Sequence, residues 1–86
     1  MALVFIPTMF QNLSNGTAQV RVEGKTLREL LTNLEEVLPG VREHLVPGWK
    51  FRDDLVVAID GEVAIDLTDR VGENSEVHFI PPIAGG

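Results

Sequence analysis

The sequence contains no cysteine, and this absence excludes several kinds of chemistry at once. Without a thiol the chain has no disulfide, no thiolate metal site, no iron–sulfur cluster and no cysteine nucleophile. The two histidines, His44 and His78, lie in different predicted elements and have no second ligand at metal-binding spacing. We therefore expect neither a metal site nor a bound cofactor.

Basic residues are also scarce, with seven Lys and Arg against thirteen Asp and Glu, for a net charge of −6. Nucleic acid and anionic membranes would repel such a surface, because phosphate binding depends on clustered basic residues. The acidity fits a basic protein partner, whose encounter with the chain it would speed. The alternative is that the excess carboxylates only keep a small protein soluble.

Long hydrophobic runs are missing too, and no segment approaches the ~18–20 apolar residues of a membrane span. The N-terminus has no basic region followed by an apolar stretch, so the expected location is the cytoplasm. The 86 residues make one domain. Such a chain can bury one helix against one sheet, but it has no room for a deep catalytic cleft.

The first half of the chain has the pattern of two strands and a helix. Residues 3–6 are a short apolar run, and apolar and polar residues alternate over residues 18–22 after the Asn15-Gly16 turn signal. Thr26 and Glu29 have the spacing of a capping box, and leucines then recur at helical intervals up to Pro39-Gly40.

The second half has the pattern of three more strands. We expect a buried strand over residues 55–59, an Asp60-Gly61 hairpin turn, a short return over residues 62–65 and a last strand over residues 76–80. The order β-β-α-β-β-β predicts an α+β domain. If the first and last strands pair centrally, this is the ubiquitin-like β-grasp, a mixed sheet of about five strands with one main helix across it.

The last six residues form a predicted flexible C-terminal Gly-Gly tail, residues 81–86, on a domain of residues 1–80. Pro81 and Pro82 favour an extended conformation of about 3.1 Å per residue, so that the tail could reach roughly 18 Å. Gly85 and Gly86 have no Cβ and could enter a narrow active site. The alternative is a frayed terminus, where small residues often collect.

The tail offers the chemistry of its carboxylate. A partner that holds ATP and Mg²⁺ could convert the Gly86 carboxylate to an acyl adenylate, and a sulfur nucleophile could then displace AMP and leave a thiocarboxylate. The chain has no phosphate-binding G-x-x-x-x-G-K motif of its own. We therefore predict a substrate of other enzymes and not an enzyme.

Residues 76–86, Glu-Val-His-Phe-Ile-Pro-Pro-Ile-Ala-Gly-Gly, resemble the end of the MoaD/ThiS family of ubiquitin-like sulfur carriers. The length and the order of elements extend this resemblance over essentially the whole chain. It implies that Gly86 is adenylated and thiocarboxylated, that Gly85 and Ala84 give access, and that Pro82 and Pro81 are a spacer. It also implies an adenylating, ubiquitin-activating-like enzyme and a sulfur donor such as a desulfurase or rhodanese as partners.

The resemblance leaves the acceptor open. The run from Phe79 to Pro82 is similar to the non-catalytic small subunit of molybdopterin synthase, whose partner would be the large subunit, and as the better match it makes a molybdopterin-type carrier the first expectation. Ile6-Pro7-Thr8 and the Ala-Gly-Gly ending also resemble carriers of cysteine biosynthesis, which hand sulfur to a pyridoxal-phosphate cysteine synthase. Three further functions are compatible with the residues: a thiamine-type carrier, a protein modifier joined through Gly86 to lysines, and a plain binding module.

A partner-binding patch is predicted at the root of the tail. Alternation puts Val77 and Phe79 on the core face of the last strand, and His78 and Ile80 on the other face. Exposed apolar residues beside a reactive tail often mark an interface. The predicted patch consists of Ile80, His78, Ile83 and Phe10. Met9 and Phe10 lie in the long first loop, where each could extend the patch or pack inward.

Overall fold

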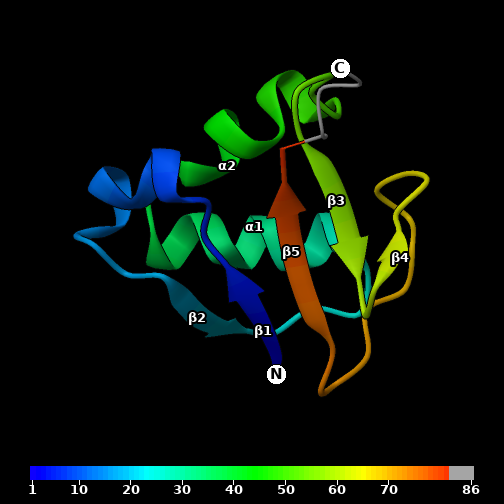
Figure 1. Ribbon diagram of the computed structural model, residues 1–86. Helices are drawn as coiled ribbons and strands as arrows, with labels where there is room; N and C mark the ends of the chain where they lie inside the picture. The colour runs from blue at the N-terminus through cyan, green and yellow to red at the C-terminus, as the bar shows by residue number, and fades with distance from the viewer. Residues whose placement is uncertain (82–86) are drawn as a thin grey trace.

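The computed structural model describes residues 1–81, and residues 82–86 lie outside the described part. Five strands form one sheet in the order β2-β1-β5-β3-β4, and α1 lies across one face of it (Figure 1). The strands are β1 (Ala2–Phe5), β2 (Gln19–Val22), β3 (Val56–Ile59), β4 (Glu62–Val63) and β5 (Glu76–Ile80). The helices are α1 (Leu27–Val37), α2 (Val41–Leu45) and the 3₁₀ helices η1 (Thr8–Ser14) and η2 (Pro47–Trp49).

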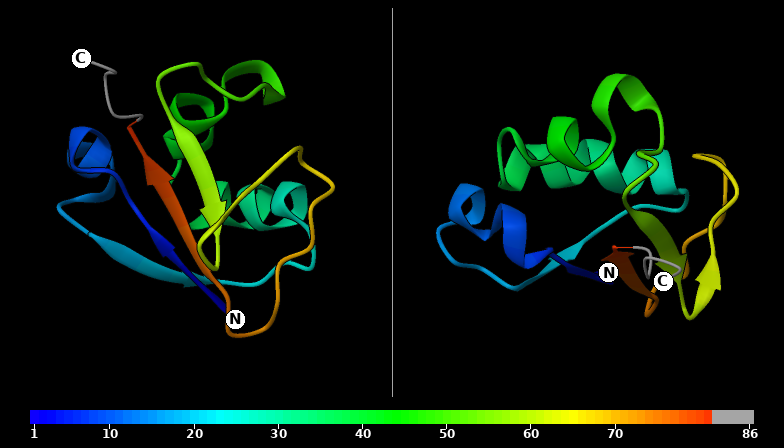
Figure 2. Two further views of the ribbon diagram at one scale, coloured as in Figure 1. Left: turned by 45° about the vertical axis from the view of Figure 1, so that its right-hand side comes forward. Right: turned by 45° about the horizontal axis from the view of Figure 1, so that its top comes forward.

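The centre of the sheet is the pairing of the first strand with the last, as the sequence predicted. β5 runs parallel to β1, with Val4 opposite Val77, and antiparallel to β3, with Val57 opposite Phe79. Both helices lie on one side of the sheet, and within residues 1–81 the other side is left open (Figure 2). This mixed sheet with one main helix packed on it is the ubiquitin-like β-grasp, and the prediction of the fold is confirmed.

Helix α1 begins at the residue that the capping pattern predicted. The Thr26 hydroxyl oxygen accepts the Glu29 N–H at 3.2 Å, while the Glu29 carboxylate accepts the N–H of Lys25 at 3.4 Å, one residue before the expected partner. Four leucines of the predicted stripe, Leu27, Leu30, Leu31 and Leu34, are fully buried, while the fifth, Leu38, is the C-cap and only partly buried. Their burial supplies most of the stability of this short helix.

The hairpin between β3 and β4 has the predicted turn but a shorter return. Asp60 and Gly61 have φ values of 53° and 85°, the left-handed pair that a tight two-residue hairpin requires. We expected a strand up to residue 65, but β4 ends at Val63. The Ile65 N–H donates to the Asp69 carboxylate at 2.7 Å, so this side chain turns the backbone away from the sheet.

The connection between β1 and β2 is the 3₁₀ helix η1, in which successive side chains point about a third of a turn apart. Met9 is therefore 51% exposed while Phe10 is only 8% exposed, with its ring 5.4 Å from the His44 ring. Phe10 belongs to the core, so its predicted place in the surface patch is wrong. Met9, which could pack either way on sequence grounds, takes the exposed position.

Candidate functional site

The root of the tail is Pro81, which directly follows the central strand of the sheet. β5 is hydrogen-bonded to β1 on one side and to β3 on the other, so the root is fixed by two neighbouring strands. Pro81 is exposed where β5 leaves the sheet, at the end of the molecule opposite the N-terminus (Figure 1). The predicted site residues Pro82, Ile83, Ala84, Gly85 and Gly86 lie outside the described residues.

Side chains of β5 alternate between the core and the open face of the sheet. Val77 and Phe79 are buried, with 0% and 5% of their surface exposed, and they face α1. Ile80 is 47% exposed on the open face, and His78 is half-buried there. The structure thus brings together on one surface two of the predicted patch residues, at the point where the tail begins.

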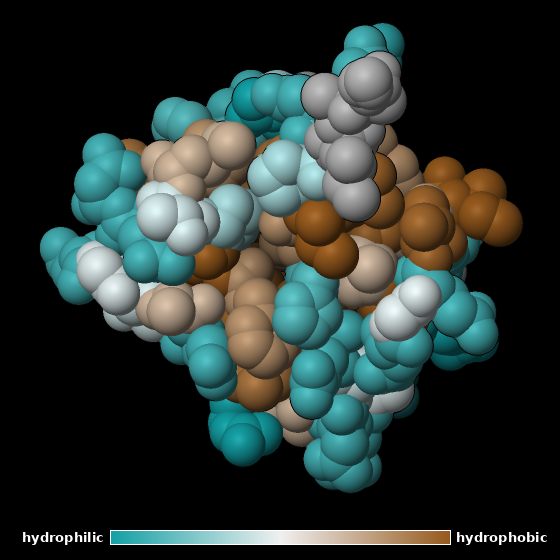
Figure 3. All heavy atoms as spheres, in the orientation of Figure 1, coloured by the Kyte–Doolittle hydropathy of each residue, from teal (hydrophilic) through white to brown (hydrophobic). Residues whose placement is uncertain are grey.

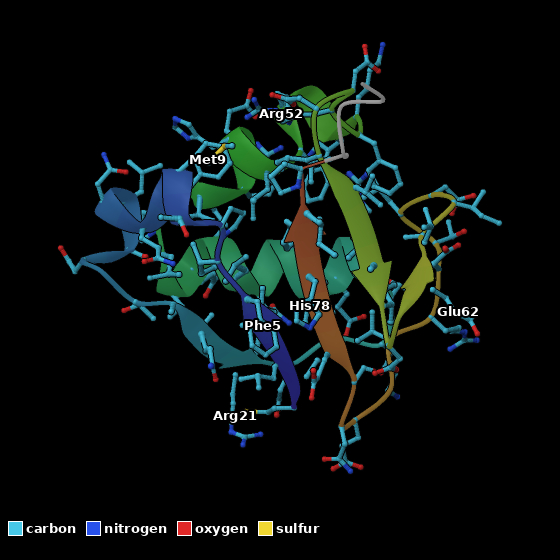
Figure 4. The ribbon with its side chains drawn as sticks, in the orientation of Figure 1. Phe5, Met9, Arg21, Arg52, Glu62 and His78 are labelled. Atoms are coloured by element: carbon cyan, nitrogen blue, oxygen red, sulfur yellow. The ribbon has the colours of Figure 1, made fainter. Side chains whose placement is uncertain are left out.

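His78 is covered on one side by an aromatic ring that the pattern of the last strand alone does not predict. Phe5 of β1 lies opposite His78 in the parallel register, and the two rings stack with their centroids 4.0 Å apart and their planes 11° apart (Figure 4). On the other side, His78 Nε2 lies 3.3 Å from a carboxylate oxygen of Glu76. The stack holds the imidazole face to face with the Phe5 ring, and the partly exposed His78 side chain stays available to a partner.

A shallow apolar groove surrounds the tail root. We call its exposed surface the tail-root patch, and it is formed by Phe5, Pro7, Met9, His78, Ile80 and Pro81. Figure 3 shows hydrophobic surface gathered around the end of β5. Phe5 and Pro7 were missed because they come from the other end of the sequence, whereas Met9 was one of two residues that could extend the patch or pack inward. The signal that could have found them is the β1–β5 register, which places Phe5 beside His78.

The beginning of β5, at the end of the sheet away from the tail root, is held by the carboxylate of Asp60. Asp60 accepts the Ser75 hydroxyl at 2.6 Å and the Glu76 N–H at 2.9 Å. These hydrogen bonds, first that of Ser75 and then that of Glu76, hold the pKa of the Asp60 carboxyl below its usual value. Asp60 thereby ties the β3–β4 turn to the first residue of the strand that carries the tail.

Neither a metal centre nor a buried orphan group suggests catalysis in the described part of the chain. Among residues 1–81 no three or more His, Asp or Glu side chains are grouped so that they could hold a metal ion. Every buried side-chain nitrogen and oxygen described has a hydrogen-bond partner. In the same residues, no helix is long and apolar enough to cross a bilayer.

A β-grasp domain whose central strand ends in an exposed root with an apolar surround has the architecture of the small ubiquitin-like carriers and modifiers. Residues 6–86 match the model of the ThiS family. The chain therefore belongs to the ThiS family of ubiquitin-like sulfur carrier proteins, as the end of its sequence suggested, and members of this family are small carrier proteins and not catalysts.

Solved structures of similar fold are known from bacteria and archaea. The chain is 25% identical, over the full length of both chains, to one in the crystal structure of the Amycolatopsis orientalis BexX/CysO complex, with a TM-score of 0.88. It is 23% identical to Mycobacterium tuberculosis CysO, an antigen, covering 96% of this chain and 100% of that one, with a TM-score of 0.87. It is 24% identical to SAMP1 from Haloferax volcanii, covering 99% of this chain and 98% of that one, with a TM-score of 0.68. No curated protein sequence matches the chain.

Proposed function

We propose that this protein is a sulfur carrier whose Gly86 carboxylate is adenylated and then converted to a thiocarboxylate that donates sulfur in a biosynthetic pathway. The observation that carries this proposal is the position of β5. The central strand, bonded on both sides, ends at an exposed Pro81 beside an apolar patch, and membership of the ThiS family agrees with such a role. The domain is then a handle, and the reacting group is at the end of the tail.

The proposed chemistry begins with a carboxylate that is ionised at neutral pH, since its reference pKa is about 3.3–3.7. On the partner enzyme a Gly86 carboxylate oxygen attacks the α-phosphorus of Mg²⁺-bound ATP, and pyrophosphate leaves. A sulfide equivalent from the sulfur donor then attacks the acyl carbon, the bond to AMP breaks, and a thiocarboxylate remains. ATP and Mg²⁺ are bound by the partner, and this ATP-dependent route suits the cytoplasm.

The remaining tail residues serve this chemistry by their shape. Gly85 has no Cβ and Ala84 has only a methyl group, so a narrow active site can close around them. Pro81 and Pro82 cannot donate to a sheet ladder and keep the tail from continuing as strand. The tail-root patch, with Ile80 and His78 at its centre, is the surface by which the activating enzyme holds the domain.

The proposal for the sulfur acceptor is based on the sequence at the root of the tail. The Phe-Ile-Pro-Pro run of residues 79–82 favours the large subunit of a molybdopterin synthase, of which this chain would be the small subunit. The likeness to CysO proteins favours the second candidate, a pyridoxal-phosphate cysteine synthase. Activity with one purified acceptor and not with the other would decide between the two.

A protein modifier is the other candidate function, because the fold is also that of SAMP1, a small archaeal modifier protein by name. Both functions begin with adenylation, and they differ in the nucleophile. A lysine amine of a target protein would form an isopeptide with Gly86, whereas a sulfide equivalent forms the thiocarboxylate.

The test of the proposal is removal of the last residue. The full chain and a variant without Gly86 are incubated with the activating enzyme of the same organism, and ATP–pyrophosphate exchange is measured. We expect exchange with the full chain and none with the shortened one. A matched control, Val37→Ala on the exposed face of α1, should support exchange as well as the native chain does. Equal exchange without Gly86 would show that the tail is incidental.

A further inference from the structure

A second exposed apolar region lies at the edge of the sheet, away from the tail-root patch. Val63 in β4 and Ile65 just after it are 68% and 83% exposed, more than any other large hydrophobic residue in the described part of the chain. Exposure of neighbouring aliphatic side chains is costly in water, and such patches often mark an interaction site. The proposed function of the tail does not explain why Val63 and Ile65 are exposed.

Ile65 forms one wall of a groove that we call the β4 groove. Its apolar lining consists of Trp49, Phe51, Ile65 and Leu67, and its rim carries Lys50, Asp66 and Thr68. Trp49, Phe51 and Leu67 are partly buried against the core, so each presents only one face to the groove. A groove with aromatic and aliphatic walls and a polar rim has the anatomy of a pocket that accepts a large apolar side chain.

Both sides of the groove are held in place. The loop after β4 is bonded to the first turn of α1, since the N–H groups of Leu27 and Arg28 donate to the carbonyl oxygens of Asp69 and Leu67, both at 3.0 Å. On the opposite wall, the Arg28 guanidinium lies 4.2 Å from the centre of the Trp49 ring. The exposure of Ile65 is therefore built into an anchored loop and does not result from a frayed one.

The β4 side of the groove is acidic, whereas Lys50 and Arg28 lie on its Trp49 side. Between Arg52 and Arg70 the sequence has acidic residues but no Lys or Arg. Glu62 points from β4 into solvent (Figure 4), and Asp66 is exposed at the rim. Hydrogen bonds from Thr68 to its carboxylate hold the pKa of Asp66 below its usual value, so that it is charged at neutral pH. Charge complementarity therefore favours an apolar side chain with basic neighbours.

Exposed Val63, two residues before the groove residue Ile65, lies in one row across the sheet with His78 of the tail-root patch. In the register of the sheet Val63 is opposite Ala58, and Ala58 is in turn opposite His78. Figure 3 shows hydrophobic surface that extends from the end of β5 toward β4 at the right-hand edge of the molecule. A partner that grips the tail root is thus already beside the groove.

We propose that the β4 groove is a second docking site for the adenylating partner, which places one or two large apolar side chains in it and Lys or Arg side chains against Glu62 and Asp66. The inference rests on the proposed function, because it takes the activating enzyme as the occupant. The activating enzyme would then recognise the carrier partly at the edge of the sheet and not only by its tail. A Gly-Gly tail has no side chains by which an enzyme could distinguish one carrier from another. The side chains of the β4 groove could provide that distinction.

The test compares Ile65→Asp with the matched control Val37→Asp, which changes a 54%-exposed valine at the other end of α1. Pyrophosphate release is measured with the activating enzyme over a range of carrier concentrations. We expect Ile65→Asp to raise KM for the carrier about tenfold or more with kcat little changed, because only docking is weakened. Val37→Asp should behave as the native chain. Glu62→Lys should raise KM several-fold at low salt, and less at high salt.

The outcomes of this test separate the two claims. If the native chain is not adenylated at all, the proposed function fails. If it is adenylated and Ile65→Asp has the same KM as Val37→Asp, the second docking site is overturned and the proposed function stands. Dimerisation of the native chain that Ile65→Asp abolishes would assign the groove to a second copy and would likewise overturn the proposal. Circular dichroism melting of each variant identifies any loss of folding.

Discussion

Truncation of Ile80 to alanine should weaken docking of the carrier while leaving the domain folded. Full burial of an isoleucine side chain is worth about 1.5–3 kcal/mol relative to exposure. Ile80 is 47% exposed in the free domain, so roughly half of that gain, about 0.7–1.5 kcal/mol, is left for a partner to realise. Because 1.4 kcal/mol is about a factor of ten, Ile80→Ala should raise the Kd for the activating enzyme about three- to tenfold.

The assay is calorimetric titration of the activating enzyme with native chain, Ile80→Ala and Val37→Ala. Val37 is an exposed valine on α1 and serves as the control for loss of an aliphatic side chain. The free energy of unfolding of Ile80→Ala, measured in urea, should fall by no more than about 1.5 kcal/mol, because only the half of the side chain that is already buried in the free domain contributes to folding. An unchanged Kd for Ile80→Ala would refute the assignment of the tail-root patch as the docking surface.

Two further predictions concern how the fold holds β5 and α1. In Gly24→Ala the new Cβ would come within 2.5 Å of the Leu30 backbone nitrogen, so the melting temperature should fall by more than about 10 °C. The control is Gly16→Ala, whose new Cβ would have open space around it. Only backbone strain of about 1 kcal/mol, from a φ of 81°, opposes this substitution. Equal melting temperatures of the two variants would contradict the steric argument. In Ser75→Ala the native hydrogen bond to Asp60 is lost, so the depression of the Asp60 pKa should lessen. A depressed pKa in the folded state stabilises the protein above the unfolded value of about 3.9 and loses that effect as the pH falls further. The native chain should therefore exceed Ser75→Ala in urea stability at pH 6, by a margin that narrows toward pH 3, and a constant margin would exclude this role of Asp60.

The sequence predicted the elements whose signals are local. The capping box at Thr26, the leucine stripe of α1 and the Asp60-Gly61 turn all depend on neighbours within a few residues, and all are present. The length of β4 was overestimated, because the Ile65 N–H is captured by a side chain further along, that of Asp69. The alternation of apolar and polar residues does not indicate whether a backbone N–H will bond to a side chain or to the neighbouring strand.

The candidate site was predictable only in the part that lies on one strand. His78 and Ile80 follow from the alternation of β5, but Phe5 joins them through the register of two strands more than seventy residues apart along the chain. Phe10 was included in the patch because the sequence of the first loop does not indicate which way its side chain points, whereas a 3₁₀ turn directs Met9 outward and Phe10 inward. The β4 groove was not predicted at all, since its walls come from η2 and from the loop after β4.

The central claim, that Gly86 becomes a thiocarboxylate, is tested most directly by the intact mass of the chain. The native protein is incubated with its activating enzyme, Mg²⁺-ATP and a sulfur donor, and its mass is recorded by electrospray ionisation. We expect a gain in mass equal to the replacement of one oxygen by sulfur, which fragmentation assigns to Gly86 and which is lost when ATP is omitted. An unchanged mass, with enzyme shown to be active on another carrier, would contradict it.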